Sequence, residues 1–267
     1  MKNKYLKTNN GSVTTILILL GLLVVIFIGV FFFRSTQQDK EVEIDIEKKS
    51  TEESKSEEEF NKKMISIIDE FIGLPYVADP LNEEFLYTEE GFNSTTLVLS
   101  VIAKAHNKDN PEEIIKKINY YPPEVVKYEN RNHFSSYRNK VSSYFNDITS
   151  NIGKDYTKTK EVTLNKKKSD GKRIIDIDWE RKIELKYIPI ENITSIIDDI
   201  PPIVGVMFVQ DKDEEIGLDV RGEGIIIENK EFVYASSKEK KVIKIDFLEY
   251  IENTNFDGVA FYEFINI

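Results

Sequence analysis

The sequence predicts an α+β domain in which N-terminal helices pack on an antiparallel sheet, behind one N-terminal transmembrane helix. Apolar residues recur at helical spacing in the first half of the chain and alternate with charged residues in the second half. A charge-free apolar run near the N-terminus predicts the membrane span. The predicted divisions are a cytoplasmic tail at 1–12, a transmembrane helix at 13–33, an acidic stalk at 34–59 and a globular domain at 60–267.

The apolar run at 13–33 contains no charged residue and is long enough to cross a bilayer, which takes roughly 20 apolar residues. The alternative is a cleavable signal peptide, whose apolar region is shorter, about 7–15 residues, and ends in a small-residue cleavage site. This run ends in Phe31-Phe32-Phe33-Arg34, so an uncleaved anchor is favoured. Lysine and arginine on both sides do not decide its orientation. Since a short tail before a first helix usually stays inside, we expect a single-pass protein of the cell membrane with its C-terminal domain outside the cytoplasm.

Charge and cysteine content exclude several functions. Beyond residue 34 the chain has 32 basic and 47 acidic residues, a net charge of −15, so the domain is not expected to bind nucleic acid. The absence of cysteine excludes disulfides, thiolate catalysis and cysteine metal sites. The segment 34–59 is too polar to fold alone, which predicts a stalk. No cofactor is expected.

Three helices are predicted in the first half of the domain. Apolar residues at helical spacing begin at Phe60, and Gly73 ends that helix. The next helix follows Asn93, a favourable N-cap, and is apolar on nearly all sides, so it should be buried. His106, near its end, is interpreted as a cation that suits the helix dipole. The third helix covers 111–121.

The second half predicts strands separated by charged or glycine-containing turns. An alternating stretch at 172–188 predicts a strand pair, and the basic stretch before it, 164–173, predicts a turn. The acidic cluster at 211–215 is interpreted as a charged turn rather than a cation site, because it lacks the glycine and terminal glutamate of a calcium loop. No metal site is expected. The further strands are predicted at 203–210, 224–228, 232–236, 242–247 and 256–264.

Several stretches together resemble a known family. They lie at 71–81, 92–105, 131–137, 218–251 and 255–262. The chain resembles the N-acetylmuramoyl-L-alanine amidase-like proteins of domain-of-unknown-function family 1460, which belong to the NlpC-type, papain-like cell-wall hydrolases. The resemblance covers about 60–267 and implies a papain-like NlpC-type domain.

The resemblance also implies a catalytic site that this chain has lost. The family carries a cysteine nucleophile at the start of the central helix, a histidine base on a neighbouring strand and a polar residue that orients the histidine. The matching positions hold Ser94, Gly222 and Tyr234. A hydroxyl is barely nucleophilic without a general base, and glycine offers none. The resemblance therefore implies a pseudoenzyme, in which Ser94 is an ordinary residue at a helix start; the alternative is a serine nucleophile served by a non-standard base.

Three further residues have two interpretations each. Arg131 and His133 lie in a stretch similar to one expected to line the substrate groove of relatives, so they are candidate ligand contacts. His133 would be the residue to rescue Ser94, and its alternative is a loop histidine satisfied by backbone groups. Glu223, beside the vacated base position, is interpreted as a solvated turn acid rather than a replacement base.

Three functional hypotheses follow. In the preferred one, a membrane-anchored, catalytically inactive amidase-like domain binds a cell-envelope component, either a peptidoglycan peptide or a protein partner. In the second, an active cell-wall amidase or peptidase uses Ser94 with a non-standard base. In the third, the chain is a structural envelope protein without a small ligand.

Overall fold

The computed structural model describes residues 52, 54–78, 87–122, 124–210 and 217–267, with one compact unit at Glu57–Ile267. The predicted transmembrane helix at 13–33 and the acidic cluster at 211–215 lie outside the described residues. Among the residues that are described, no helix has the length and apolar character that crossing a membrane requires.

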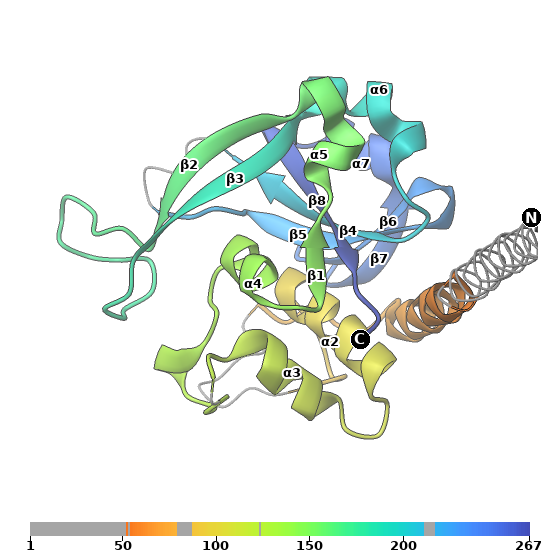
Figure 1. The fold of residues 1–267 in the computed structure, drawn as a ribbon, viewed down its shortest axis with the longest axis horizontal. Coiled ribbons are helices and arrows are strands. Elements are labelled where there is room, and N and C mark those ends of the chain that lie inside the picture. The colour runs from red at the N-terminus through yellow and green to blue at the C-terminus, as the bar shows by residue number, and fades with distance from the viewer. Residues whose placement is uncertain (1–51, 53, 79–86, 123, 211–216) are drawn as a thin grey trace, which may run out of the picture. The chain divides into compact units, whose positions relative to one another are not determined.

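The sheet is antiparallel and has eight strands in the order β2-β3-β8-β4-β5-β6-β7, with β1 on β8 (Figure 1). All five shorter predicted strands match observed ones, β4, β5, β6, β7 and β8, to within two residues at each end. Strand β7 ends one residue before the predicted end because Phe247 starts a helix. The strands are β1 Phe145–Asp147, β2 Lys158–Leu164, β3 Arg181–Pro189, β4 Val204–Val209, β5 Gly222–Ile227, β6 Glu231–Ser236, β7 Lys241–Asp246 and β8 Gly258–Phe264.

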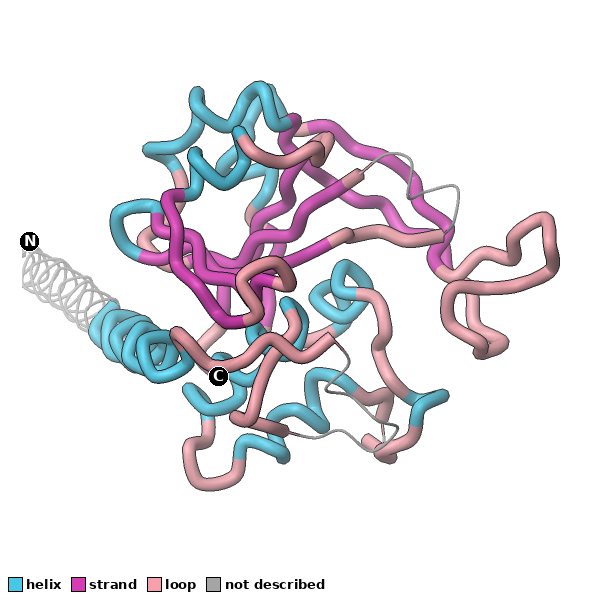
Figure 2. Tube along the Cα trace, turned by 180° about the vertical axis from the view of Figure 1, so that it is seen from behind, coloured by secondary structure: helices cyan, strands magenta, loops and turns pink. Residues whose placement is uncertain are grey.

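Helices cover both faces of the sheet (Figures 1 and 2). Figure 1 shows α2, α3 and α4 on one side and α5, α6 and α7 on the other. A first helix covers 54–71. The α-helices that follow are α2 Ser94–His106, α3 Pro111–Asn119, α4 Ser135–Val141, α5 Thr149–Gly153, α6 Ile193–Ile196 and α7 Phe247–Glu252. The short 3-10 helices are Tyr128–Asn130, Lys154–Tyr156, Ile190–Asn192, Ile197–Asp199 and Glu228–Lys230. The predicted α+β class, with helices packed on an antiparallel sheet, is confirmed.

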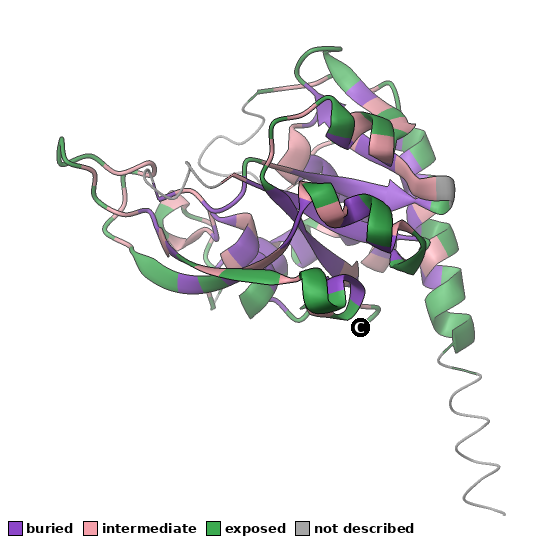
Figure 3. Cartoon of the chain, turned by 90° about the horizontal axis from the view of Figure 1, so that it is seen from above, coloured by how far each residue is buried: buried purple, intermediate pink, exposed green. Residues whose placement is uncertain are grey.

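The alternation of side chains along the strands divides the core into two layers. On β5, Ile225 and Ile227 pack toward α2, whereas Ile226 packs with Phe232 on the opposite face. Helix α2 lies against β5 and β6, and ten of its thirteen residues are buried. Figure 3 shows the buried strands at the centre and exposed positions on the outer helix surfaces. The predicted burial of α2 is confirmed.

The prediction of a strand pair within 172–188 is wrong in part. Only β3 forms there, and its partner is β2, while 165–180 form a long loop. Buried Asn165 orders this loop: its Nδ2 donates to the carbonyls of Ile177 (3.3 Å) and Trp179 (2.9 Å), and its Oδ1 accepts from the amide of Ile175 (2.9 Å). These bonds satisfy backbone groups that a strand pair would otherwise have paired.

The interpretation of His106 as a helix-end cation is also wrong. Its ring lies between Phe60 and Tyr144, with each pair of ring centroids 4.9 Å apart. Burial lowers the pKa of His106, and a backbone hydrogen bond with Ile265 opposes that effect only in part. The ring is therefore a neutral part of the core, where it ties the end of α2 to the C-terminal segment.

Candidate functional site

The site begins at the N-terminus of α2, where the local sequence forms a capping box. The side chain of Asn93 accepts a hydrogen bond from the amide of Thr96, and Thr96 Oγ1 accepts one from the amide of Asn93, both at 2.9 Å. This reciprocal pair places Ser94 as the first residue of the helix, half-buried and near the positive end of the helix dipole. The predicted role of Asn93 as N-cap is confirmed.

A cavity of about 310 Å³ opens at this helix start and contains all three positions that the resemblance assigned to catalysis. Ser94 comes from α2, Gly222 from the beginning of β5 and Tyr234 from β6. The remaining lining residues come from β4, β5, β6, α7 and the loops and turns beside them: Tyr76, Asn93, Phe208, Arg221, Glu223, Ala235, Ser236, Ser237, Lys238, Tyr250 and Phe256.

The base position is open space. A Cβ atom added at Gly222 would meet no heavy atom within 4 Å. Glycines elsewhere in the sheet differ, because a Cβ at Gly224 would lie 2.4 Å from the Phe232 ring and one at Gly205 would lie 2.1 Å from Tyr262. Packing therefore requires glycine at 205 and 224 but not at 222, where a side chain would fit.

Aromatic rings form one wall of the cavity. Tyr234 stacks on Phe232 with ring centroids 4.9 Å apart and planes 11° from parallel, and its ring also contacts Tyr250. Phe208 contacts both Tyr250 and Phe256. Burial and the neighbouring Tyr234 raise the pKa of Tyr250 to about 12, so its hydroxyl stays protonated at neutral pH. Tyr234 is thus held by ring packing rather than placed to orient a base.

Glu223 belongs to a buried network, so its interpretation as a solvated turn acid is wrong. Glu223 is 2% exposed, and Arg138 Nη2 lies 2.8 Å from Glu223 Oε2. Ser135 donates to Oε1 at 2.7 Å and Tyr262 to Oε2 at 3.3 Å. Burial alone would raise the pKa of Glu223, but the charge of Arg138 and the hydrogen bonds from Arg138, Ser135 and Thr95 together hold it below its ordinary value.

This network removes the nearest carboxylate as a general base. Glu223 stays ionised, but Arg138, Ser135 and Tyr262 occupy its oxygen atoms. Among the described residues, no hydrogen bond involves the hydroxyl of Ser94. The cavity also contains no histidine. A serine without a base beside it is a poor nucleophile.

Arg131 and His133 lie apart from this cavity, between the 3-10 helix Tyr128–Asn130 and α4, and line no part of it. His133 Nε2 donates to the carbonyl oxygen of Tyr128 at 2.8 Å. Burial lowers the pKa of His133 to about 4, and the nearby Arg131 contributes to this. Arg131 pairs through its backbone with Tyr120. The structure therefore brings Ser94, Gly222 and Tyr234 together but not Arg131 and His133 with them.

A family model described as N-acetylmuramoyl-L-alanine amidase-like matches residues 66–259. The chain belongs to this family. Since the chain has no cysteine, a catalytic cysteine is absent from this amidase-like protein. The predicted family is confirmed, and the curated proteins include no match to the chain.

Solved structures similar to this amidase-like protein share its fold. A Legionella pneumophila protein of family model DUF1460 is 20% identical, with a TM-score of 0.63 over 78% of this chain and 89% of that chain. An N-acetylmuramoyl-L-alanine amidase from Bacteroides uniformis is 17% identical, with a TM-score of 0.59 over 78% and 100%. A putative xylanase from Bacteroides fragilis is 18% identical, with a TM-score of 0.56 over 74% and 99%.

The buried network around Glu223 is the part of the site that sequence reasoning missed. Glu223 alternates with Ile225 and Ile227, which both face α2, and this period of two was visible in the sequence. The alternation predicts that the carboxylate points into the core, where it needs a cation. Nothing in the sequence identified Arg138 as that cation, because the short helix α4 was not predicted.

Proposed function

We propose that this amidase-like domain is a non-catalytic binding module of the cell envelope, held at the membrane by residues 13–33. Its ligand is a peptidoglycan stem peptide or a protein segment with similar chemistry. We also propose that the domain has the papain-like NlpC-type fold. The observation that carries it is the cavity at Ser94, which is retained while Gly222 leaves the base position empty.

The lining of the Ser94 cavity supports a ligand with both apolar and anionic parts. The aromatic wall offers apolar contact surface, and Ser94, Ser236 and Ser237 offer hydroxyl groups. Lys238 adds an exposed cationic side chain to a cavity whose one carboxylate, Glu223, is paired with Arg138. Although the domain is acidic overall, this cation favours a carboxylate-bearing ligand locally.

The decisive experiment separates binding from hydrolysis. The full chain in detergent is incubated with purified muropeptides, and mass spectrometry follows release of the stem peptide while calorimetry measures binding. We expect binding without turnover, since loss of a nucleophile or base that acts as a unit costs on the order of 10⁶ in turnover. Turnover that disappears with Ser94→Ala would contradict the proposal and favour a serine hydrolase.

Matched variants test whether this cavity is the binding site. Lys238→Ala removes a cation from the cavity lining, whereas Lys182→Ala removes one from the outer part of β3, away from the cavity. We expect weaker stem-peptide binding only for Lys238→Ala. Unchanged affinity in both variants, or no binding by the unaltered chain, would favour a protein partner or a purely structural role.

A further inference from the structure

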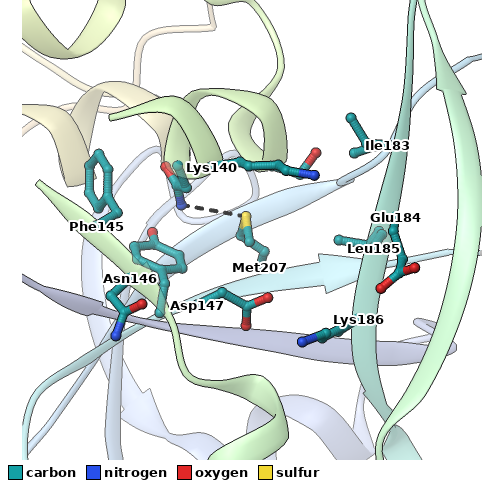
Figure 4. A pocket seen from close by; sticks show the side chains of 12 residues that line it. Lys140, Phe145, Asn146, Asp147, Ile183, Glu184, Leu185, Lys186 and Met207 are labelled. Carbon is teal, nitrogen blue, oxygen red and sulfur yellow. Dashed lines mark hydrogen bonds between the residues drawn. The ribbon is translucent and has the colours of Figure 1, made fainter. Parts of the chain in front are cut away.

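A second cavity, of about 360 Å³, lies between β1, β3 and α4 and shares no residue with the cavity at Ser94 (Figure 4). Three consecutive residues of β1, at 145–147, and four consecutive residues of β3, at 183–186, line it. Successive side chains of a strand point to opposite faces of a sheet. A cavity that touches every residue in a row therefore runs along the edges of these strands rather than over one face.

These edges are open because β1 and β3 share one side of β8. On the other side of β8, strand β4 pairs with residues 258–262 of β8. On the shared side, β1 pairs with 262–264, whereas β3 pairs only through its last two residues, Ile188 and Pro189. The rest of β3 diverges from β8, and within the described residues no strand pairs with that edge. Backbone groups on such an edge are a template for an added strand.

The walls between the two edges combine apolar and charged side chains. Phe145, Leu185, Met207 and Tyr262 supply apolar surface. Figure 4 shows Asp147 and Lys186 pointing into the space between β1 and β3, with Met207 above them in this view.

Charges of both signs surround this apolar surface. Lys140 and Glu184 line the cavity together with Asp147 and Lys186, and among the described residues no ion pair joins any of these four. The cavity therefore offers both signs of charge to a bound molecule, beside its apolar side chains.

We infer that this cavity binds an extended peptide segment of a partner protein, which adds as a strand along the open edge of β3. The backbone of the segment pairs with β3, an apolar side chain rests on Met207 and Tyr262, and one acidic and one basic side chain meet the opposite charges of the walls. A strand edge favours an extended polypeptide, because its backbone groups can form hydrogen bonds with the backbone of the peptide. These hydrogen bonds provide affinity, and the pockets for the side chains of the peptide provide specificity. The inference does not depend on the function proposed for the Ser94 cavity.

The absence of native cysteine makes a site-specific test available. Twelve-residue peptides are selected by display against the full chain in detergent, and the enriched sequences are synthesised. The single thiol of a Lys186→Cys variant reports on the cavity, and that of Lys241→Cys reports on an exposed position of β7 at the far end of the sheet. We expect an enriched peptide to slow alkylation of the first thiol about tenfold and to leave the second unchanged. It should also slow amide hydrogen exchange within 181–187.

Charge exchange provides a second readout that does not require a cysteine. Lys186→Glu should weaken the binding of a peptide that carries an acidic residue, and replacing that acidic residue of the peptide by lysine should restore binding. Selection of no peptide, equal protection of both thiols, or protection of 222–238 in place of 181–187 would overturn the inference. Protection of the Lys186→Cys thiol on raising the concentration of the chain alone would also overturn it, because the occupant would then be a second copy.

Discussion

At the scale of single residues, Gly222 occupies the position that the resemblance assigned to the catalytic base. Its backbone does not need glycine, since no positive φ occurs there, and a Cβ atom would meet nothing within 4 Å. Gly224, two residues along the same strand, is required because Phe232 and the carbonyl of Val233 occupy its side-chain space. The absence of a side chain at 222 thus follows from neither packing nor backbone conformation.

A pair of alanine variants tests this contrast. Gly222→Ala should change the free energy of unfolding by no more than about 0.5 kcal/mol, as an unhindered surface substitution does. Gly224→Ala should lower it by about 1–3 kcal/mol, because the added methyl overpacks the Phe232 ring. Urea denaturation measures both. Equal losses in the two variants would show that the space at Gly222 is not open in solution.

His133 makes the stability of the domain depend on pH. The unfolded ring takes up a proton below its ordinary pKa near 6.5, whereas burial keeps the folded ring neutral down to about 4. The unfolded state binds more protons between these values, so the stability from neutral His133 is present above pH 6.5 and is lost as the pH falls toward 4. Because the ring is partly exposed, we expect a loss of about 1–2 kcal/mol.

The measurement compares urea unfolding of the unaltered chain and of His133→Gln at pH 7 and pH 4.5. The variant should lose less stability than the unaltered chain over this interval. Only the difference between the two proteins is informative, since burial also lowers the pKa of His106 and raises that of Asp219. Identical pH profiles would mean that His133 titrates normally in the folded state.

At the scale of the elements, the Arg138–Glu223 pair joins α4 to β5 beneath the Ser94 cavity. Both side chains are 1% exposed, and Tyr262 of β8 and Thr95 of α2 also bond the carboxylate. Four elements therefore meet at one buried charge. The pair keeps the N-terminus of α2 beside β5, which is the arrangement that forms the cavity.

Removal of one partner should destabilise the domain strongly. Arg138→Met leaves the Glu223 carboxylate buried without its cation, which costs about 3–5 kcal/mol. The double variant Arg138→Met, Glu223→Leu should recover part of that loss, since no charge then remains buried. Urea denaturation of both single variants and the double variant gives the coupling energy. Additive losses would contradict a direct interaction.

Helices and strands with a clear periodicity of apolar residues could be predicted from the sequence. Segments whose structure depends on contacts between distant residues could not. Helix α2 and strands β4, β5 and β6 follow from apolar periodicity, and the cap at Asn93 follows from residue type. The loop at 165–180 could not be predicted in this way. Its backbone is held by side-chain hydrogen bonds from the buried Asn165 rather than by strand pairing, and such bonds leave no periodic pattern in the sequence. In the site, the family resemblance located Ser94, Gly222 and Tyr234, but the partner of Glu223 lies on a short helix whose sequence pattern is weak.

At the scale of the whole molecule, charge and hydropathy are separated along the chain. The apolar run at 13–33 has no charge, while the residues beyond 34 carry a net charge of −15. Anionic lipid repels such a domain, so its overall field cannot hold it at a membrane. Any stable membrane association must therefore come from the apolar run.

This separation predicts how the full chain fractionates. We expect it to stay in the membrane fraction through washes with high salt and at alkaline pH, and to be released when Leu20 and Val25 are both changed to arginine. Each arginine near the centre of a membrane helix costs about 2.5–3.5 kcal/mol on insertion scales. Two substitutions of Ser35 and Thr36 to arginine, just outside the run, form the matched control and should leave the chain membrane-bound.

The orientation of the chain in the membrane can be tested by adding protease to cells whose outer layers are permeable but whose cell membrane is intact. A domain outside the cytoplasm places the segment 34–59 within reach of the enzyme, so digestion should release a fragment close in size to 57–267, the compact unit. A chain that is cut only after the membrane is permeabilised would place the domain in the cytoplasm, away from cell-wall peptides. That result would leave the binding cavity at Ser94 without access to the ligand class proposed for it.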